Sequence, residues 1–226
     1  GNSGNNTLDG GLGVDNLRGG LGDDVYLVDL TGANLMQDSV LESVSEGTDR
    51  ILLRGGTSAL STYVTLTLGA NLEILDASGT GSVKMNLIGN ALANTLIGND
   101  TANTLNGALG ADVLIGGSGV VDDSADQIVE NAGQGSDLAL IAFGTGGQTY
   151  TLADNLESAK ITGTFGQTLI GNTENNTLYG GSGDDHLVGG AGNDRLYAAG
   201  GSDASPVAGS ADILEGGAGD DIYFGV

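Results

Sequence analysis

Apolar residues recur along this chain at every ninth position, with glycine-rich polar segments between them. Each stands in the middle of a three-residue stretch, and the other six residues of the unit are rich in glycine, asparagine and aspartate. Those residue types favour turns, whereas three residues can form a short strand whose middle side chain points inward. The recurring residues are Leu8, Leu17, Tyr26, Leu96, Leu105, Leu114, Leu178, Leu187, Leu196, Leu214 and Tyr223.

The nine-residue units form three arrays that are separated by two inserts. The inserts alternate apolar and polar residues, which predicts short strands, with a helix over 35–45 as the alternative. The chain is therefore divided into an array at 1–29, an insert at 30–79, a degenerate asparagine-rich array at 80–121, a shorter copy of the insert at 122–162 and an array at 163–226.

The two inserts are related to each other. VLE followed by GTD (40–49) corresponds to VE followed by GSD (129–137), and TLTLGANLE (65–73) corresponds to TYTLADNLE (149–157). Counted from the glycine pairs that begin at Gly19 and Gly116, the shared glutamate is nine residues nearer in the second copy. This difference predicts that the second insert has lost one nine-residue unit.

A three-residue strand cannot bury its apolar side chain alone, but stacked copies of the same unit can. Two units would make one coil of two strands and two turns, and parallel stacking of coils would bury a continuous leucine column. The predicted fold class is all-β, a parallel β-roll or β-helix solenoid.

Charge and composition exclude several classes of protein. Six basic against 29 acidic residues give a net charge of −23, which argues against nucleic acid and anionic membranes as partners. Hydrophobic residues make up 39% of the chain, too many for a disordered tail, and no apolar run is long enough for a membrane span. The absence of cysteine excludes disulfides and thiolate metal sites. Since residue 1 already lies inside a repeat, the chain is expected to be a fragment of a larger protein.

The sixth position of each unit carries the candidate chemistry. In a stack, these carboxylates would lie roughly 5 Å apart along the edges, where they repel one another unless a cation lies between them. Calcium suits such a site best, because it takes about six to eight oxygens from carboxylates and backbone carbonyls. Mg²⁺ demands stricter octahedral order, and Zn²⁺ prefers nitrogen and sulfur ligands. The predicted carboxylate ligands are Asp15, Asp24, Asp112, Asp185, Asp194, Asp203, Asp212 and Asp221.

Asparagine replaces aspartate at the sixth position of four units. Asn6, Asn94, Asn103 and Asn176 offer either neutral carbonyl ligands or a structural asparagine ladder, and the ladder is the preferred interpretation. The middle array is therefore expected to hold the fewest ions. Turn carbonyls near Gly181, Gly183, Gly190 and Gly192 are expected to complete the calcium shells.

With two units in each coil, alternate units share an edge. In the last array, Asp185, Asp203 and Asp221 are then expected on one edge. Asn176, Asp194 and Asp212 are expected on the other. Ions should bridge neighbours along each edge, which makes Asp203 a ligand of two ions.

Five units match G-G-x-G-x-D-x-U-x in full, where U is a large apolar residue, at 10–18, 19–27, 180–188, 189–197 and 216–224. The pattern resembles the nonapeptide of the repeat-in-toxin (RTX) family, and the likeness covers about half of the chain. The inserts also look like segments that recur between such arrays in large secreted RTX proteins. The resemblance implies a β-roll with Ca²⁺ between successive turns, a type I secretion apparatus as export partner, and folding outside a Gram-negative bacterium.

No enzymatic activity is expected, and two functions stay open. His186 is the only histidine and occupies an outward position, so no His-paired zinc site can form. The first function is a calcium-binding module of a secreted protein that folds on extracellular calcium. The alternative is an adhesive or surface-layer spacer that binds glycans or neighbouring subunits. Both place the chain outside the cell or on its surface.

Overall fold

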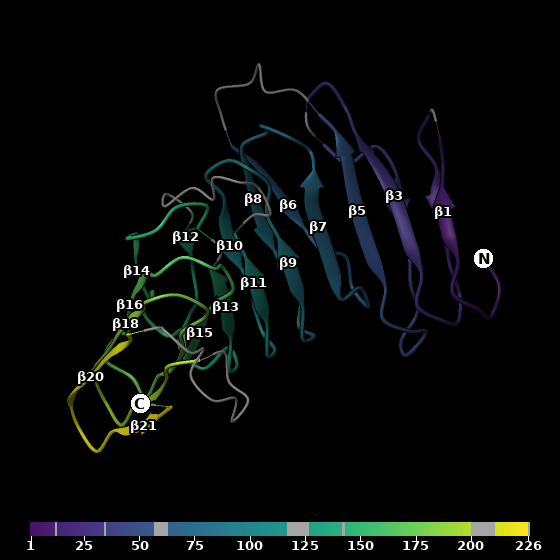
Figure 1. Ribbon diagram of the computed structural model, residues 1–226. Coiled ribbons are helices and arrows are strands. Elements are labelled where there is room, and N and C mark those ends of the chain that lie inside the picture. Colours follow the sequence, from purple (N-terminus) through teal and green to yellow (C-terminus); the bar gives the residue numbers. More distant parts are fainter. Residues whose placement is uncertain are drawn as a thin grey trace.

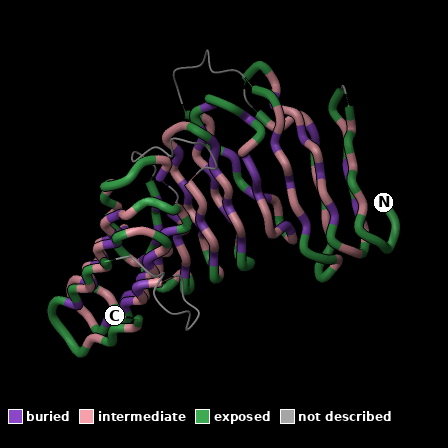
Figure 2. The backbone as a smooth tube through the Cα atoms, viewed as in Figure 1, coloured by how far each residue is buried: buried purple, intermediate pink, exposed green. Residues whose placement is uncertain are grey.

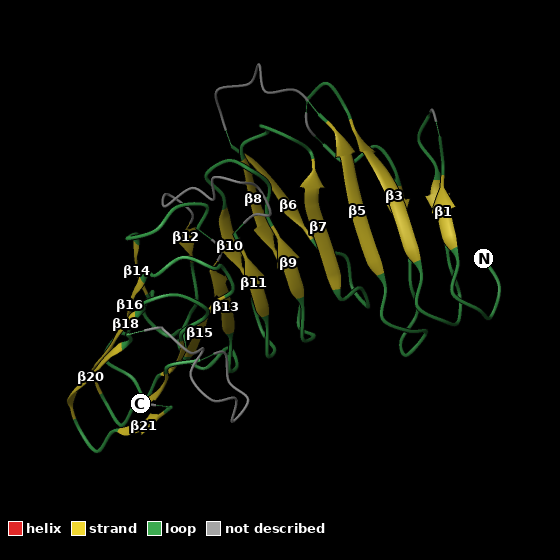
Figure 3. Ribbon diagram, viewed as in Figure 1, coloured by secondary structure: helices red, strands yellow, loops and turns green. Residues whose placement is uncertain are grey.

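Every regular element in the described part of the chain is a β-strand (Figure 3). The computed structural model describes residues 1–11, 13–33, 35–56, 63–116, 127–141, 143–199 and 211–225. The helix considered over 35–45 does not form, and this segment contains the short strand β4 (Ser39–Val40) instead. None of the described residues belongs to a helix that could cross a membrane.

The strands alternate between two walls of a solenoid, and their order along the long sheet follows the sequence from one end to the other (Figure 1). One wall is an eleven-stranded sheet within the described residues: β1 (Thr7–Asp9), β3 (Val25–Leu30), β5 (Arg50–Gly55), β7 (Ile74–Gly79), β9 (Thr95–Ile97), β11 (Val113–Ile115), β13 (Leu138–Ile141), β15 (Ser158–Ile161), β17 (Thr177–Tyr179), β19 (Arg195–Tyr197) and β21 (Ile222–Phe224).

The other wall consists of shorter sheets. They comprise β2 (Asn16–Leu17) with β4; β6 (Val64–Thr67), β8 (Met85–Ile88), β10 (Thr104–Asn106) and β12 (Gln127–Ile128); and β14 (Thr149–Thr151), β16 (Thr168–Ile170), β18 (His186–Ala191) and β20 (Ile213–Ala218).

A coil of the regular stack contains two nine-residue units. Leu96 of β9 pairs in parallel with Leu114 of β11. The residues that precede them on the two coils, Asn94 and Asp112, are hydrogen-bonded and lie 18 residues apart in the sequence. On the opposite wall, Leu87 of β8 pairs in parallel with Leu105 of β10. The predicted all-β, parallel solenoid with two strands in each coil is confirmed.

The recurring apolar residues fill the space between the two walls. Buried positions alternate with partly exposed ones along the strands (Figure 2), as the pleat of a strand requires. Burying one such side chain fully stabilises the fold by about 1.5–3 kcal/mol. The fully buried members of the predicted column are Tyr26, Leu96, Leu105, Leu114, Leu178, Leu187 and Leu196.

The two tyrosines at the apolar position differ in burial but share a hydrogen bond. Tyr26 is fully buried, and its hydroxyl accepts the N–H of Gly19 at 2.5 Å. Tyr223 is 45% exposed, because β21 pairs only with β19 in the described chain; its hydroxyl accepts the N–H of Gly216 at 3.0 Å. The inward position that the period gives to both tyrosines is therefore fully buried for Tyr26, whereas Tyr223 stays half-exposed.

The inserts form wider coils of the same stack. Asp24 and Asp49 occupy the same place on successive coils and are 25 residues apart in the sequence. Asp112 and Asp137 are also 25 residues apart. Since β5 pairs with β3, and β13 pairs with β11, each wide coil continues the long sheet without interruption. The additional residues lie between the strands and leave the sheet intact.

The second insert has not lost a nine-residue unit. Gly19 and Gly107 each donate their N–H to a glutamate 23 residues further on, which is Glu42 in the first insert and Glu130 in the second. Gly107, not Gly116, is therefore the counterpart of Gly19. The second copy is shorter only in the following coil, where the backbone step is 20 residues instead of 24.

Candidate metal-binding edges

Among the described residues, the sixth residue of a unit lies directly before a strand, so stacking brings these residues into two columns. The first edge precedes the strands of the long sheet and contains Asn6, Asp24, Asp49, Glu73, Asn94, Asp112, Asp137, Glu157, Asn176, Asp194 and Asp221. The second edge precedes the strands of the opposite wall and contains Asp15, Asp38, Asn103, Gln148, Gln167, Asp185 and Asp212.

One oxygen of most side chains in these columns accepts a backbone N–H from the preceding coil. Asp112 Oδ1 accepts the N–H of Asn94 at 2.6 Å, and Asp194 Oδ1 accepts that of Asn176 at 2.8 Å. On the second edge, Asp185 Oδ1 accepts the N–H of Gln167 at 2.8 Å. These bonds tie each carboxylate to the coil before it and fix the direction of its other oxygen.

The other oxygen of several carboxylates is buried and has no hydrogen-bond partner among the described residues. A buried polar atom without a partner costs about 1–3 kcal/mol, and more when it carries charge. A hard cation between the coils would satisfy these atoms, and carboxylate oxygens are ligands that calcium prefers. The unpartnered atoms are Oδ2 of Asp15, Asp24, Asp49, Asp112 and Asp194.

Burial raises the pKa of these acids. Burial raises the pKa of Asp112 to about 6, and the charge of Asp137 adds to this effect. The pKa of Asp185 is raised by burial and by nearby Asp212, and that of Asp194 is raised by burial and by nearby Asp221. The ionised forms are therefore disfavoured unless a cation compensates them.

Two arginines are paired with acids on the strands. Arg54 pairs with Asp9 at 2.9 Å and with Asp29 at 2.8 Å, and Arg50 pairs with Asp76. These acids lie on strands β1, β3 and β7, outside the two columns. Arg50 and Arg54 therefore neutralise acids that do not belong to the edges.

Glycine is required because the acid of each unit folds back over the start of the same turn. A Cβ on Gly189, the first residue of its unit, would overlap the Asp194 carboxylate and the carbonyl oxygen of Gly216 in the next coil. Gly192, the fourth residue, has a φ of 115°, and its Cβ would overlap the backbone of Glu174 in the preceding coil. The glycine positions therefore make room for the acid and for close stacking of the turns.

The predicted carbonyl ligands lie where the turns of successive coils meet. The carbonyl oxygens of Gly190 and Gly192 face the turn of the next coil at Gly217 and Gly219. Gly183 has a φ of 114° in the equivalent turn, and Gly181 donates its N–H to Asp185 Oδ2 at 2.8 Å. Calcium ligation by these carbonyls stays a prediction.

Three asparagines of the columns, Asn6, Asn94 and Asn176, both accept and donate hydrogen bonds within the protein. Asn94 Oδ1 accepts the N–H of Asn90 at 2.6 Å, and its amide donates to the carbonyl of Leu72 at 3.2 Å. Such bonds favour the structural ladder over a ligand role. Bonds of these kinds also involve the side chains of Asn6, Asn103 and Asn176.

The last array differs from the predicted edge order. Asp185 donates its N–H to Asp212, and Asp194 donates its N–H to Asp221, each across a step of 27 residues. Asp212 and Asp221 therefore exchange the edges predicted for them, because this coil has the length of three units and not two. Asn176 and Asp194 are neighbours as predicted. Asp203 and the bridges predicted for it lie outside the described residues.

Several residues of the columns were not predicted from the sequence. Asp49 and Asp137 end the shared GTD and GSD motifs, and Glu73 and Glu157 end the shared NLE motif. These motifs were recognisable as repeats, and each ends directly before a strand as the sixth residue of a unit does. Asp38, Gln148 and Gln167 also belong to the columns, because each lies directly before a strand.

His186 is the first residue of β18 and directly follows Asp185 of the second edge. Its side chain is 36% exposed, and its Nε2 atom is 3.4 Å from a carboxylate oxygen of Glu215 on the adjacent strand β20. This agrees with the outward strand position expected from the sequence.

Comparison with known families finds one match. The family described as RTX calcium-binding nonapeptide repeat (4 copies) matches residues 1–26, 88–120, 167–204 and 209–225, about half of the chain. The matched segments fall in the three arrays, and the inserts remain unmatched. No curated protein gives a significant match.

Proposed function

Since the chain belongs to the family of RTX calcium-binding nonapeptide repeat proteins, we propose that it is the calcium-binding module of a type I-secreted bacterial protein and folds on extracellular calcium. The observation that carries this proposal is the row of buried, unpartnered carboxylate oxygens at the edges of the roll. The net charge of −23 supports it, because so few basic residues cannot neutralise stacked acids.

The proposed mechanism couples export to folding through calcium. Where calcium is scarce, repulsion between the stacked acids opposes closure of the coils, and the chain stays extended for secretion. Where calcium is abundant, the ion binds the folded coils and not the unfolded chain, and binding stabilises the fold by mass action. Because each coil contacts its neighbours, folding of one coil favours folding of the next.

A second candidate function is an adhesive or surface-layer spacer that binds glycans or neighbouring subunits. A row of aromatic rings on the long sheet favours it, with ring centroids 4.8 Å apart for Tyr179 and Tyr197 and 4.1 Å apart for Tyr197 and Phe224. Aromatic side chains supply large contact areas at interfaces. Binding to a glycan array, or calcium-dependent assembly into particles, would favour this function over the first.

The calcium concentration needed for folding tests the proposed function. We expect a cooperative gain of β-structure, followed by circular dichroism, with a midpoint at about 10⁻⁴ to 10⁻³ M calcium, the range of extracellular modules. Magnesium at the same concentrations is the control and should give little structure. A midpoint below roughly 10⁻⁷ M, in the affinity range of intracellular calcium proteins, would contradict folding that waits for export.

A further inference from the structure

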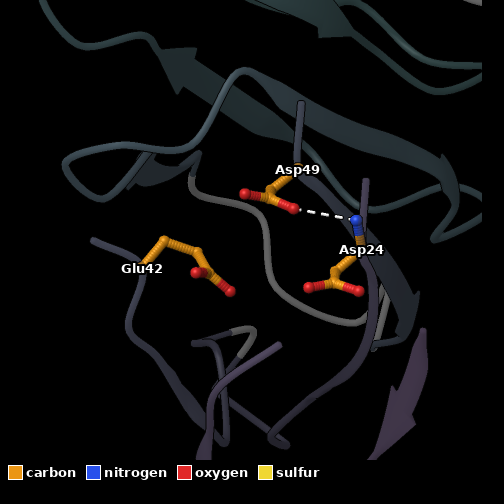
Figure 4. A group of neighbouring side chains, drawn as sticks. All are labelled: Asp24, Glu42 and Asp49. Carbon is orange, nitrogen blue, oxygen red and sulfur yellow. Dashed lines mark hydrogen bonds between the residues drawn. The ribbon is translucent and has the colours of Figure 1, made fainter. Parts of the chain in front are cut away.

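In the first insert, a glutamate joins two aspartates of the first edge. Asp24, Glu42 and Asp49 point their carboxylates toward one another (Figure 4), and one ligand oxygen from each lies within 4.8 Å of the other two. Asp24 and Asp49 precede β3 and β5, whereas Glu42 comes from the loop after β4. We call these three residues the first insert site.

Each carboxylate of this site is held by one oxygen, and its other oxygen is unpartnered. Asp24 Oδ1 accepts the N–H of Asn6 at 2.6 Å, and Asp49 Oδ1 accepts the N–H of Asp24 at 2.8 Å. Glu42 Oε1 accepts the N–H of Gly19 at 3.0 Å. The remaining oxygens are buried without a hydrogen-bond partner, and Asp24 and Asp49 are each only 1% exposed.

The second insert repeats these hydrogen bonds with Asp112, Glu130 and Asp137, which we call the second insert site. Glu130 Oε1 accepts the N–H of Gly107 at 2.9 Å, and Asp137 Oδ1 accepts that of Asp112 at 2.7 Å. Asp112 Oδ2 and Glu130 Oε2 are again buried without a partner. None of the three residues is more than 6% exposed.

We propose that each insert site binds one calcium ion through its two aspartates and its glutamate. In the first insert site, the three oxygens lie within 4.8 Å of one another and can share an ion, because calcium lies about 2.3–2.6 Å from each ligand. Three carboxylates in a water-poor position need a compensating cation. In the second insert site, the charges that act on each carboxyl group come from other acids.

Glu42 belongs to a coil that is longer than two nine-residue units. The coil between Asp24 and Asp49 has 25 residues where a regular coil has 18. The loop that holds the additional residues brings Glu42 to the edge of the roll. A pocket lined by residues that include Arg18 and Leu41 opens beside Glu42.

This inference rests on the calcium binding proposed above and assigns a role to the inserts. Each insert would bind a calcium ion of its own, and this ion would hold the wide coil against the neighbouring coils of the stack. Calcium-coupled folding would then extend through segments that lie outside the nonapeptide arrays.

Neutralising the glutamates tests the insert sites. Glutamine keeps the side-chain oxygen that accepts the glycine N–H but removes the charge, so Glu42→Gln and Glu130→Gln should fold in excess calcium. We expect each substitution to lower the number of bound calcium ions by one, and the double variant to lower it by two. Native mass spectrometry of the full chain, titrated with calcium, counts the ions.

Glu46→Gln is the matched control, because Gln134 holds the equivalent place in the second insert. Its ion count should equal that of the wild type. An unchanged count in Glu42→Gln and Glu130→Gln would overturn the inference, whereas a wild type that takes up no calcium would overturn the proposed function instead.

Diffraction from calcium-grown crystals of the wild type tests the inference without any variant. An anomalous peak is expected between Asp24, Glu42 and Asp49. If ions occupy the nonapeptide turns and neither insert site, the inference is wrong and the proposed function stands.

Discussion

At pH 8 and free of metal, the chain is expected to lose most of its β-structure and to regain part of it as the pH is lowered toward 5. Burial, with the charges of Asp137 and Asp112 adding, raises the pKa of Glu130 to about 7, and the pKa of Asp112 is raised to about 6. A carboxyl group with a raised pKa in the folded state binds its proton more tightly there than in the unfolded chain. Between about pH 4 and pH 7, lowering the pH therefore stabilises the metal-free fold.

Urea denaturation of metal-free protein at pH 5, 6, 7 and 8 measures this effect, with circular dichroism as the readout. The same series in saturating calcium is the control. It should show the opposite trend, because protons compete with calcium for the carboxylates. If the free energy of unfolding of the metal-free protein rises with pH, ionisation of the buried acids does not destabilise the fold, and the prediction is wrong.

Gly189→Ala is expected to lower the free energy of unfolding in calcium by about 3 kcal/mol, the upper end of the usual range for overpacking. The added methyl group would overlap the Asp194 carboxylate and the carbonyl oxygen of Gly216. To avoid this overlap, either the Asp194 side chain must move out of the turn or the next coil must move away. Calcium affinity should therefore fall together with stability.

Gly32→Ala is the matched control for this substitution. Gly32 is exposed, and a Cβ there would meet no atom within 4 Å. Its free energy of unfolding should stay within about 0.5 kcal/mol of the wild type. Equal urea midpoints for the two alanine variants would contradict the close turn packing described above.

The period of nine was sufficient to predict the regular part of the fold. Apolar side chains that recur every nine residues can share one core only when pairs of units stack, and this fixes the 18-residue coil and the two acidic columns. Asp185 and Asp194 were placed correctly on opposite edges for this reason. Their neighbours Asp212 and Asp221 were not, because the coil between each pair has 27 residues, the length of three units and not two.

The insert sites could not be predicted from the sequence and became visible only in the structure. Glu42 and Glu130 were recognisable as a shared residue, yet the length of their coils could not be read from a sequence with no nine-residue period. The mistaken deletion of one unit has the same origin, since Gly116 continues the glycine pattern but does not face Glu130. Hydrogen bonding identifies Gly107 as the partner, which brings Glu130 close to Asp112 and Asp137.

The central claim is that calcium uptake and formation of the coils are one process. The most direct test follows bound calcium and far-UV circular dichroism in the same titration of the full chain at pH 8. Both signals are predicted to rise together, with the bound ions and the β-structure reaching saturation at the same calcium concentration. Full β-structure before any calcium is bound, or saturated calcium binding to a chain without β-structure, would contradict the claim.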